Sequence, residues 1–236
     1  MRGLLWVVSL GIATLVVLVV IGVQVVVPAV VAAAVGGSPA LAGQHVTVQV
    51  RTSLAGVLLG GRIDEVTVEG AGIQASSFDV GQLALTASDV TISTALPARL
   101  GGTLTDVTAF TLGGTKLYVG SVVISGAADQ ATLVASIDPS ALEAALAAEV
   151  QSLGLGDFQI RVADGTIRIT AGGREDVGTL RLEDQTLVFD PGAGQSPIPL
   201  LDSPPDGAWH LAGVSLSAAG ARITAILDLA RLGLRG

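Results

Sequence analysis

The sequence predicts an α+β protein: an N-terminal transmembrane helix, followed by an antiparallel β-sheet packed on one long amphipathic helix. Three observations lead to this prediction. An uncharged apolar run opens the chain, apolar and polar residues alternate with period two over most of the remainder, and one stretch after Asp138 has helical spacing. We therefore divide the chain into an anchor at residues 1–35, a linker at 36–43 and a folded domain at 44–236.

The opening run is long enough to cross a bilayer. Residues 4–23 contain only two polar side chains, and a helix needs roughly 20 apolar residues for a hydrocarbon core of about 30 Å. The competing interpretation is a cleaved signal peptide, whose apolar part has about 7–15 residues, with a small-residue site at 40–42. Because the valine-rich run continues to residue 31, we expect an uncleaved anchor. Arg2 then predicts a single-pass protein of the cell membrane, with its N-terminus in the cytoplasm and its folded domain outside.

Composition excludes several classes of function. The net charge is −8 and the 12 basic residues are scattered, which argues against nucleic acid and against a polybasic membrane contact. The chain has no cysteine, so disulfides and thiolate chemistry are excluded. Aromatic residues make up only 3%, too few for a carbohydrate-stacking surface.

Alternation with period two indicates the strands. It begins with Val46, Val48 and Val50, which are separated by Thr47 and Gln49. The same pattern predicts further strands at 63–68, 83–92, 104–112, 117–124, 133–137, 209–216 and 223–229. Glycine, proline and aspartate punctuate the gaps, as in an antiparallel meander.

Two hairpins and one loop are predicted from turn residues. Asp164-Gly165 lies between two alternating runs, which is the strongest short-range hairpin signal. A second hairpin is predicted around Asp184-Gln185. Residues 197–205 contain four prolines, and proline cannot donate to a sheet ladder, so we expect a loop there.

One helix is predicted after the strand that ends near Ile137. Pro139 suits the first helical position, and Ser140 with Glu143 has the spacing of a capping box. One apolar stripe follows, and Gly154 ends the helix. The stripe consists of Leu142, Leu146, Val150 and Leu153.

No pattern of catalytic or metal-binding residues is present. Residues 70–75 match a GxGxxA dinucleotide fingerprint, but a strand rather than a helix follows them. The two histidines stand alone, and the adjacent acidic pairs are typical of solvated turns. We therefore predict no enzyme activity, no catalytic residue, no metal and no cofactor.

Consecutive apolar residues at 122–124 and 187–189 break the alternation that one wet face would require. Ordinary burial on both faces of the sheet would produce such runs. An apolar groove for an acyl chain would produce them as well.

Residues 58–73 read Leu-Leu-Gly-Gly-Arg-Ile-Asp-Glu-Val-Thr-Val-Glu-Gly-Ala-Gly-Ile, and an Ile-Asp-Pro-Ser-Ala-Leu helix start follows at 137–142. With the Leu-x-x-Pro-Pro segment at 201–205 and the Val-x-Leu-x-x-x-Gly segment at 214–220, this resembles the actinobacterial DUF2993 or LmeA-like proteins over about residues 44–230. The chain departs from their pattern in its short segment after the anchor and in Gly61-Arg62.

The resemblance implies a TULIP-like fold, in which a curved sheet wraps a helix, and a phospholipid-binding role in the cell envelope that supports lipoglycan or envelope lipid biosynthesis. We therefore expect a membrane-anchored protein that holds acyl chains between sheet and helix, with an acyl lipid and the membrane as its partners. The alternative is a non-catalytic scaffold or accessory protein of envelope machinery. The candidate lipid contacts are Leu58, Leu59, Arg62, Arg99, Leu146 and Val150.

Overall fold

The structure is a computed structural model of the chain. It describes residues 45–53, 56, 60–74, 78–94, 96–110, 116–152, 158–171, 173–192, 196–202, 208–228 and 231. The predicted anchor at 1–35 and linker at 36–43 lie outside these residues. No described helix combines the length and the apolar character that crossing a bilayer requires.

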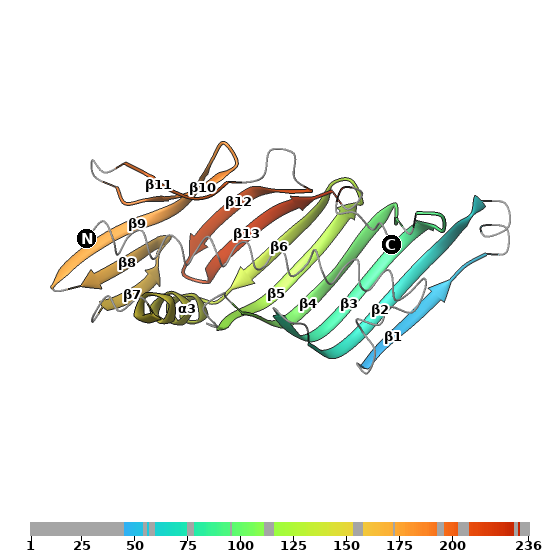
Figure 1. Cartoon of the computed structure of the whole chain (residues 1–236), viewed down its shortest axis with the longest axis horizontal. Helices are drawn as coiled ribbons and strands as arrows, with labels where there is room; N and C mark the ends of the chain where they lie inside the picture. Colours follow the sequence, from blue (N-terminus) through green and yellow to red (C-terminus); the bar gives the residue numbers. More distant parts are fainter. Residues whose placement is uncertain are drawn as a thin grey trace.

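The larger of two antiparallel sheets has eight strands, in the order β1-β2-β3-β4-β5-β6-β13-β12 (Figure 1). These strands are β1 (His45–Arg51), β2 (Arg62–Gln74), β3 (Phe78–Thr91), β4 (Arg99–Phe110), β5 (Lys116–Ala127), β6 (Ala131–Ile137), β13 (Gly220–Leu227) and β12 (Trp209–Ser217). The first six form a meander, as the alternating sequence predicts. The last two strands that the structure describes, β12 and β13, join that meander through the pairing of β13 with β6.

The smaller sheet has five strands, in the order β11-β10-β9-β8-β7. They are β7 (Phe158–Ala163), β8 (Thr166–Ala171), β9 (Arg174–Glu183), β10 (Thr186–Asp190) and β11 (Ile198–Asp202). β12 of the larger sheet packs against β9, with further contacts to β7 and β10. The two sheets therefore follow one another along the long axis of the molecule, with β1 at the far end (Figure 1).

Both predicted hairpins are confirmed. Ala163 pairs with Thr166 across Asp164-Gly165, and Glu183 pairs with Thr186 across Asp184-Gln185. All four turn residues have positive φ, between 48° and 78°. Two-residue hairpins with positive φ at both central positions match the right-handed twist of the strands they join.

The predicted loop at 197–205 is wrong in part, because Ile198–Asp202 forms strand β11. Pro199 lies opposite Val188, next to a register shift in the pairing with β10. β11 is the edge strand of its sheet, so the missing N–H of the proline need not belong to a second ladder.

The predicted α+β fold with a long helix across the sheet is wrong. The described part of the chain is mostly antiparallel β-structure, and its one helix of any length is α3 (Pro139–Ser152), with 14 residues. At 1.5 Å per residue, α3 is about 21 Å long, whereas eight strands span roughly 34 Å. α3 packs against β5, β7 and β13, at one end of the strands (Figure 1), so the TULIP-like arrangement of a sheet wrapped round a helix is not what these elements form.

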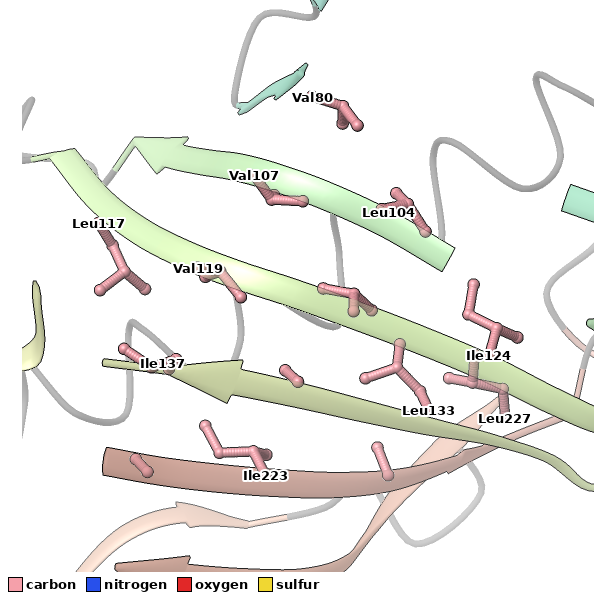
Figure 2. Close-up of a cluster of buried hydrophobic side chains, with 14 of the residues drawn as sticks. Val80, Leu104, Val107, Leu117, Val119, Ile124, Leu133, Ile137, Ile223 and Leu227 are labelled. Carbon is pink, nitrogen blue, oxygen red and sulfur yellow. The ribbon is translucent and has the colours of Figure 1, made fainter. Parts of the chain in front are cut away.

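One face of the larger sheet carries most of the hydrophobic core, and we call it the inner face. Every second side chain along these strands is buried on the inner face. The side chains between them lie on the opposite side of the sheet, which we call the outer face. Figure 2 shows part of this core, built from β3, β4, β5, β6 and β13. The labelled side chains are Val80, Leu104, Val107, Leu117, Val119, Ile124, Leu133, Ile137, Ile223 and Leu227.

A line of four residues crosses β2 to β5 and inverts the alternation of buried positions. We call it the inversion line; it consists of Gly72, Gly81, Asp106 and Gly120, which the flanking pairs place opposite one another. In β4 the buried positions change from Leu104 to Val107, a step of three residues rather than two. Gly72 and Asp106 have φ of 63° and 54°.

The inversion line keeps the apolar residues on one side of the sheet. A residue in the left-handed region turns the pleat, so the side chains beyond it exchange faces. The sequence exchanges its apolar and polar positions at the same place. As a result the inner face remains apolar over the full length of these long strands.

Candidate functional site

A continuous apolar row crosses the inner face through all eight strands. Successive register pairs join its members directly, from β1 to β12. The row is Val48, Val68, Leu85, Gly102, Ile124, Leu133, Ala225 and Leu211. Apart from Val48 and Gly102, all of these side chains are buried.

The described elements that pack on the inner face do so at one end of the row. α3 contacts β5 and β13, where Leu142 and Leu146 are buried, and the smaller sheet contacts β12. At the other end, Val48 is 36% exposed and Val50 49% exposed on edge strand β1. The apolar face therefore reaches solvent at β1.

The consecutive apolar residues singled out in the sequence have two different explanations. In β5, Val122 and Ile124 belong to the inner face, whereas Val123 is 42% exposed on the outer face. In β10, Leu187, Val188 and Phe189 are all buried, so this strand of the smaller sheet is covered on both faces.

The outer face is rich in hydroxyl groups and contains two shallow hollows. The first has a volume of about 520 Å³ and is lined by Thr86, Ser88, Arg99, Leu100, Gly101, Gly126 and Ala127. The second has a volume of about 510 Å³ and is lined by Thr47, Glu69, Gly70, Ala71, Gln82, Leu83, Ala84, Thr103 and Thr105. Both hollows lie over β3 and β4, and they follow one another along these strands.

The structure separates the sequence-predicted lipid contacts into two groups. Arg62 and Arg99 are exposed at the first positions of β2 and β4, which start at the same end of the sheet. Leu146 is buried on α3, which follows β6 at the opposite end of the strands. Arg99 lines the first hollow, and Arg62 does not.

The remaining candidates are only partly described. Leu58 and Leu59 lie outside the described residues. Val150 belongs to α3, but the structure describes only its backbone. Of the six predicted residues, the structure therefore places the side chains of Arg62, Arg99 and Leu146, and it does not test their contact with a lipid. They stay predictions.

The aspartate of the inversion line accepts a hydrogen bond from a tyrosine on the neighbouring strand β5. Tyr118 donates its hydroxyl hydrogen to Asp106 Oδ1 at 2.5 Å. This hydrogen bond, with smaller contributions from desolvation and from the charges of Asp106 and Asp138, raises the pKa of Tyr118 above 10.0. Asp106 lies beside Gly81, where an added Cβ would come within 2.6 Å of the Asp106 Cβ.

Sequence reasoning missed the hollows and the inversion line. The available signal was the occurrence of an aspartate and a glycine inside predicted strands, at Asp106 and Gly120. Among the described residues, no three histidine, aspartate or glutamate side chains gather as a metal site would require.

Comparisons with protein-family models, with curated proteins and with solved structures find no match. The proposals below therefore depend on the residues and their geometry.

Proposed function

We propose that this chain is a non-catalytic phospholipid-binding protein at the outer side of a cell membrane, and that acyl chains lie against the inner face over β2, β3 and β4. The observation that carries the proposal is the apolar row through eight strands, of which α3 and the smaller sheet occupy one end. The apolar run at residues 4–23 supports the location.

The chemistry of the inner face suits a hydrocarbon chain. Over β2 to β4 it presents Val66, Val68, Leu83, Leu85 and Leu104, with no charged group among them. Each buried methylene contributes roughly 0.8 kcal/mol to binding. The length of the acyl chain, rather than the shape of the binding surface, would therefore dominate the affinity. Leu85 and Leu104 are 2% exposed, so an entering acyl chain must replace the protein atoms that now cover them.

Quenching by brominated acyl chains tests this location with a matched pair of variants. Leu85 and Thr86 are neighbours on β3 that face opposite sides of the sheet. In the full chain with Trp6 and Trp209 replaced by Phe, Leu85→Trp and Thr86→Trp would be compared in maltoside micelles. We expect a phospholipid with brominated chains to quench the tryptophan in Leu85→Trp and to leave the one in Thr86→Trp unchanged.

Equal quenching of the two variants, or none in either, would contradict the proposal. A photoactivatable phospholipid on the unchanged chain gives an independent measurement, because it needs no bulky side chain in the core. We expect its cross-links on the inner-face residues of β2 to β4. A chain that captures a protein partner from membranes and no lipid would instead favour the scaffold function.

A further inference from the structure

Gly101 lines the first hollow of the outer face, at a position where no side chain fills the space. Register pairs place Ser88 opposite Arg99 and Thr86 opposite Gly101, so these four residues form two adjacent rows on β3 and β4. A Cβ at Gly101 would meet only the carbonyl oxygen of Ile124, at 4.0 Å. Gly101 therefore leaves open space directly beside the Arg99 side chain.

The polar groups around this space have no described partner. No ion pair or side-chain hydrogen bond joins Arg99, Thr86 or Ser88 to the described part of the chain. The nearest acidic residue in the same row is Glu65, opposite Ser88, and it pairs with Arg51 at 3.6 Å. Among the residues that the structure describes, Arg99 thus has no counter-ion, and it lies next to two half-buried hydroxyl groups.

We propose that this hollow binds a phosphate group, with Arg99 as its principal ligand and Thr86 and Ser88 as hydroxyl donors. A guanidinium group matches phosphate oxygens with two parallel hydrogen bonds, and the hydroxyls supply donors for a further oxygen. The site lies on the face opposite the proposed acyl site, so it stands apart from the proposed function.

The space beyond the phosphate indicates the class of ligand. The second hollow continues along β3 and β4 and offers Gln82, Thr103 and Thr105 as hydrogen-bonding groups. A phosphate ester of a polyol fits this arrangement, because its hydroxyl groups would lie over the second hollow. Such an ester occurs both as a lipid headgroup and as a soluble metabolite.

Titration with inorganic phosphate tests the site in the full chain, held in maltoside micelles that contain no phosphate. At constant ionic strength we expect saturable binding that Arg99→Gln weakens about tenfold or more. Arg222→Gln is the matched control, since Arg222 is also exposed on a strand of the larger sheet but does not line the hollow. We expect it to bind phosphate as the unchanged chain does.

A second variant fills the hollow and keeps the charge. Gly101→Leu places a side chain in the open space, and we expect it to reduce phosphate binding about as much as Arg99→Gln, with an unchanged unfolding transition. Absence of saturable binding, or equal losses in Arg99→Gln and Arg222→Gln, would overturn the site, since equal losses indicate diffuse attraction by net charge.

The source of the phosphate is identified by comparing soluble glycerophosphoglycerol with phosphatidylglycerol vesicles. Tighter binding of the soluble ester indicates a metabolite, and Arg99-dependent flotation with vesicles indicates a lipid headgroup; either result supports the site. Quenching in Leu85→Trp should be the same with and without Arg99→Gln. The acyl site and the phosphate site can therefore fail independently.

Discussion

At the scale of single residues, Asp106 explains why position 81 is glycine. Asp106 has a φ of 54° in the middle of β4, a conformation that aspartate tolerates better than most residues do. Its Cβ approaches Gly81 so closely that Gly81→Ala would bring two Cβ atoms within 2.6 Å. We expect this substitution to lower the free energy of unfolding by about 1–3 kcal/mol, measured by urea denaturation.

Gly101→Ala is the control for that measurement. Gly101 also lies inside a sheet, but its φ is not in the left-handed region and its added Cβ meets nothing closer than 4.0 Å. We expect little change or a slight gain in stability. Equal losses in the two variants would show that close approach to Asp106 is not the reason for glycine at position 81.

The hydrogen bond from Tyr118 to Asp106 predicts an alkaline titration. Tyr118 is the chain's one tyrosine, so tyrosinate absorbance reports its pKa directly. The raised pKa in the folded state means that this contribution to stability is fully present below about pH 10 and is lost as the pH rises through the folded pKa. We expect the midpoint to lie above 10.0 and to fall in Asp106→Asn.

Asp129→Asn removes an exposed carboxylate that does not act on Tyr118, so it should leave the midpoint unchanged. An ordinary midpoint in the unchanged chain would argue that the phenol donates to water rather than to Asp106.

At the scale of elements, a carboxylate of α3 binds a backbone N–H on the unpaired side of edge strand β7. Glu143 Oε1 accepts the backbone N–H of Val162 at 2.7 Å, instead of serving the capping box that the sequence suggested. Glu143→Ala would leave that partly buried N–H unpaired, so we expect a loss of about 1–2 kcal/mol in unfolding free energy. Glu143→Gln keeps an acceptor oxygen and should lose less.

Hydrogen exchange of the Val162 amide is the local measurement for this contact. It should accelerate in Glu143→Ala and change little in Glu175→Ala, which removes an exposed ion pair with Arg168. Unchanged exchange at Val162 in Glu143→Ala would contradict the role given to Glu143.

The elements that depend on local sequence were predictable. Asp164-Gly165 and Asp184-Gln185 fix their hairpins through residues that accept positive φ, and alternating valines fix β1. The predicted strand at 63–68 ended too early, because alternation inverts further along β2, at Gly72, where a period-two analysis loses the pattern. The helical stripe correctly placed Leu142 and Leu146 in the core, but it could not give the position of α3 relative to the sheet.

At the scale of the whole molecule, the features that sequence could not supply come from pairing between distant strands. The attachment of β13 to β6, the separate five-stranded sheet and the edge position of β11 all depend on contacts remote in sequence. The same holds for the site. Arg99 was recognisable as a candidate, whereas the hollow beside it depends on Gly101 meeting Thr86 across two strands.

Each face of the larger sheet carries a different proposed binding site. The inner face is apolar from β1 to β12, and the outer face carries hydroxyl groups, with Arg99 at the rim. Acyl chains would bind one face through apolar contacts, whereas a phosphate group would bind the other through charge and hydrogen bonds. Variants of one face should therefore leave binding at the other intact.

Mass spectrometry of the intact full chain, released from maltoside micelles after incubation with phospholipid, tests the acyl site most directly. In a chain carrying Arg99→Gln, so that the phosphate site contributes no binding, we predict that one phospholipid remains bound to each chain. We expect Leu85→Asp to abolish this added mass and Val123→Asp, at an exposed outer-face position that lines neither hollow, to preserve it. A chain that retains no lipid, or one whose lipid survives Leu85→Asp, would contradict the account.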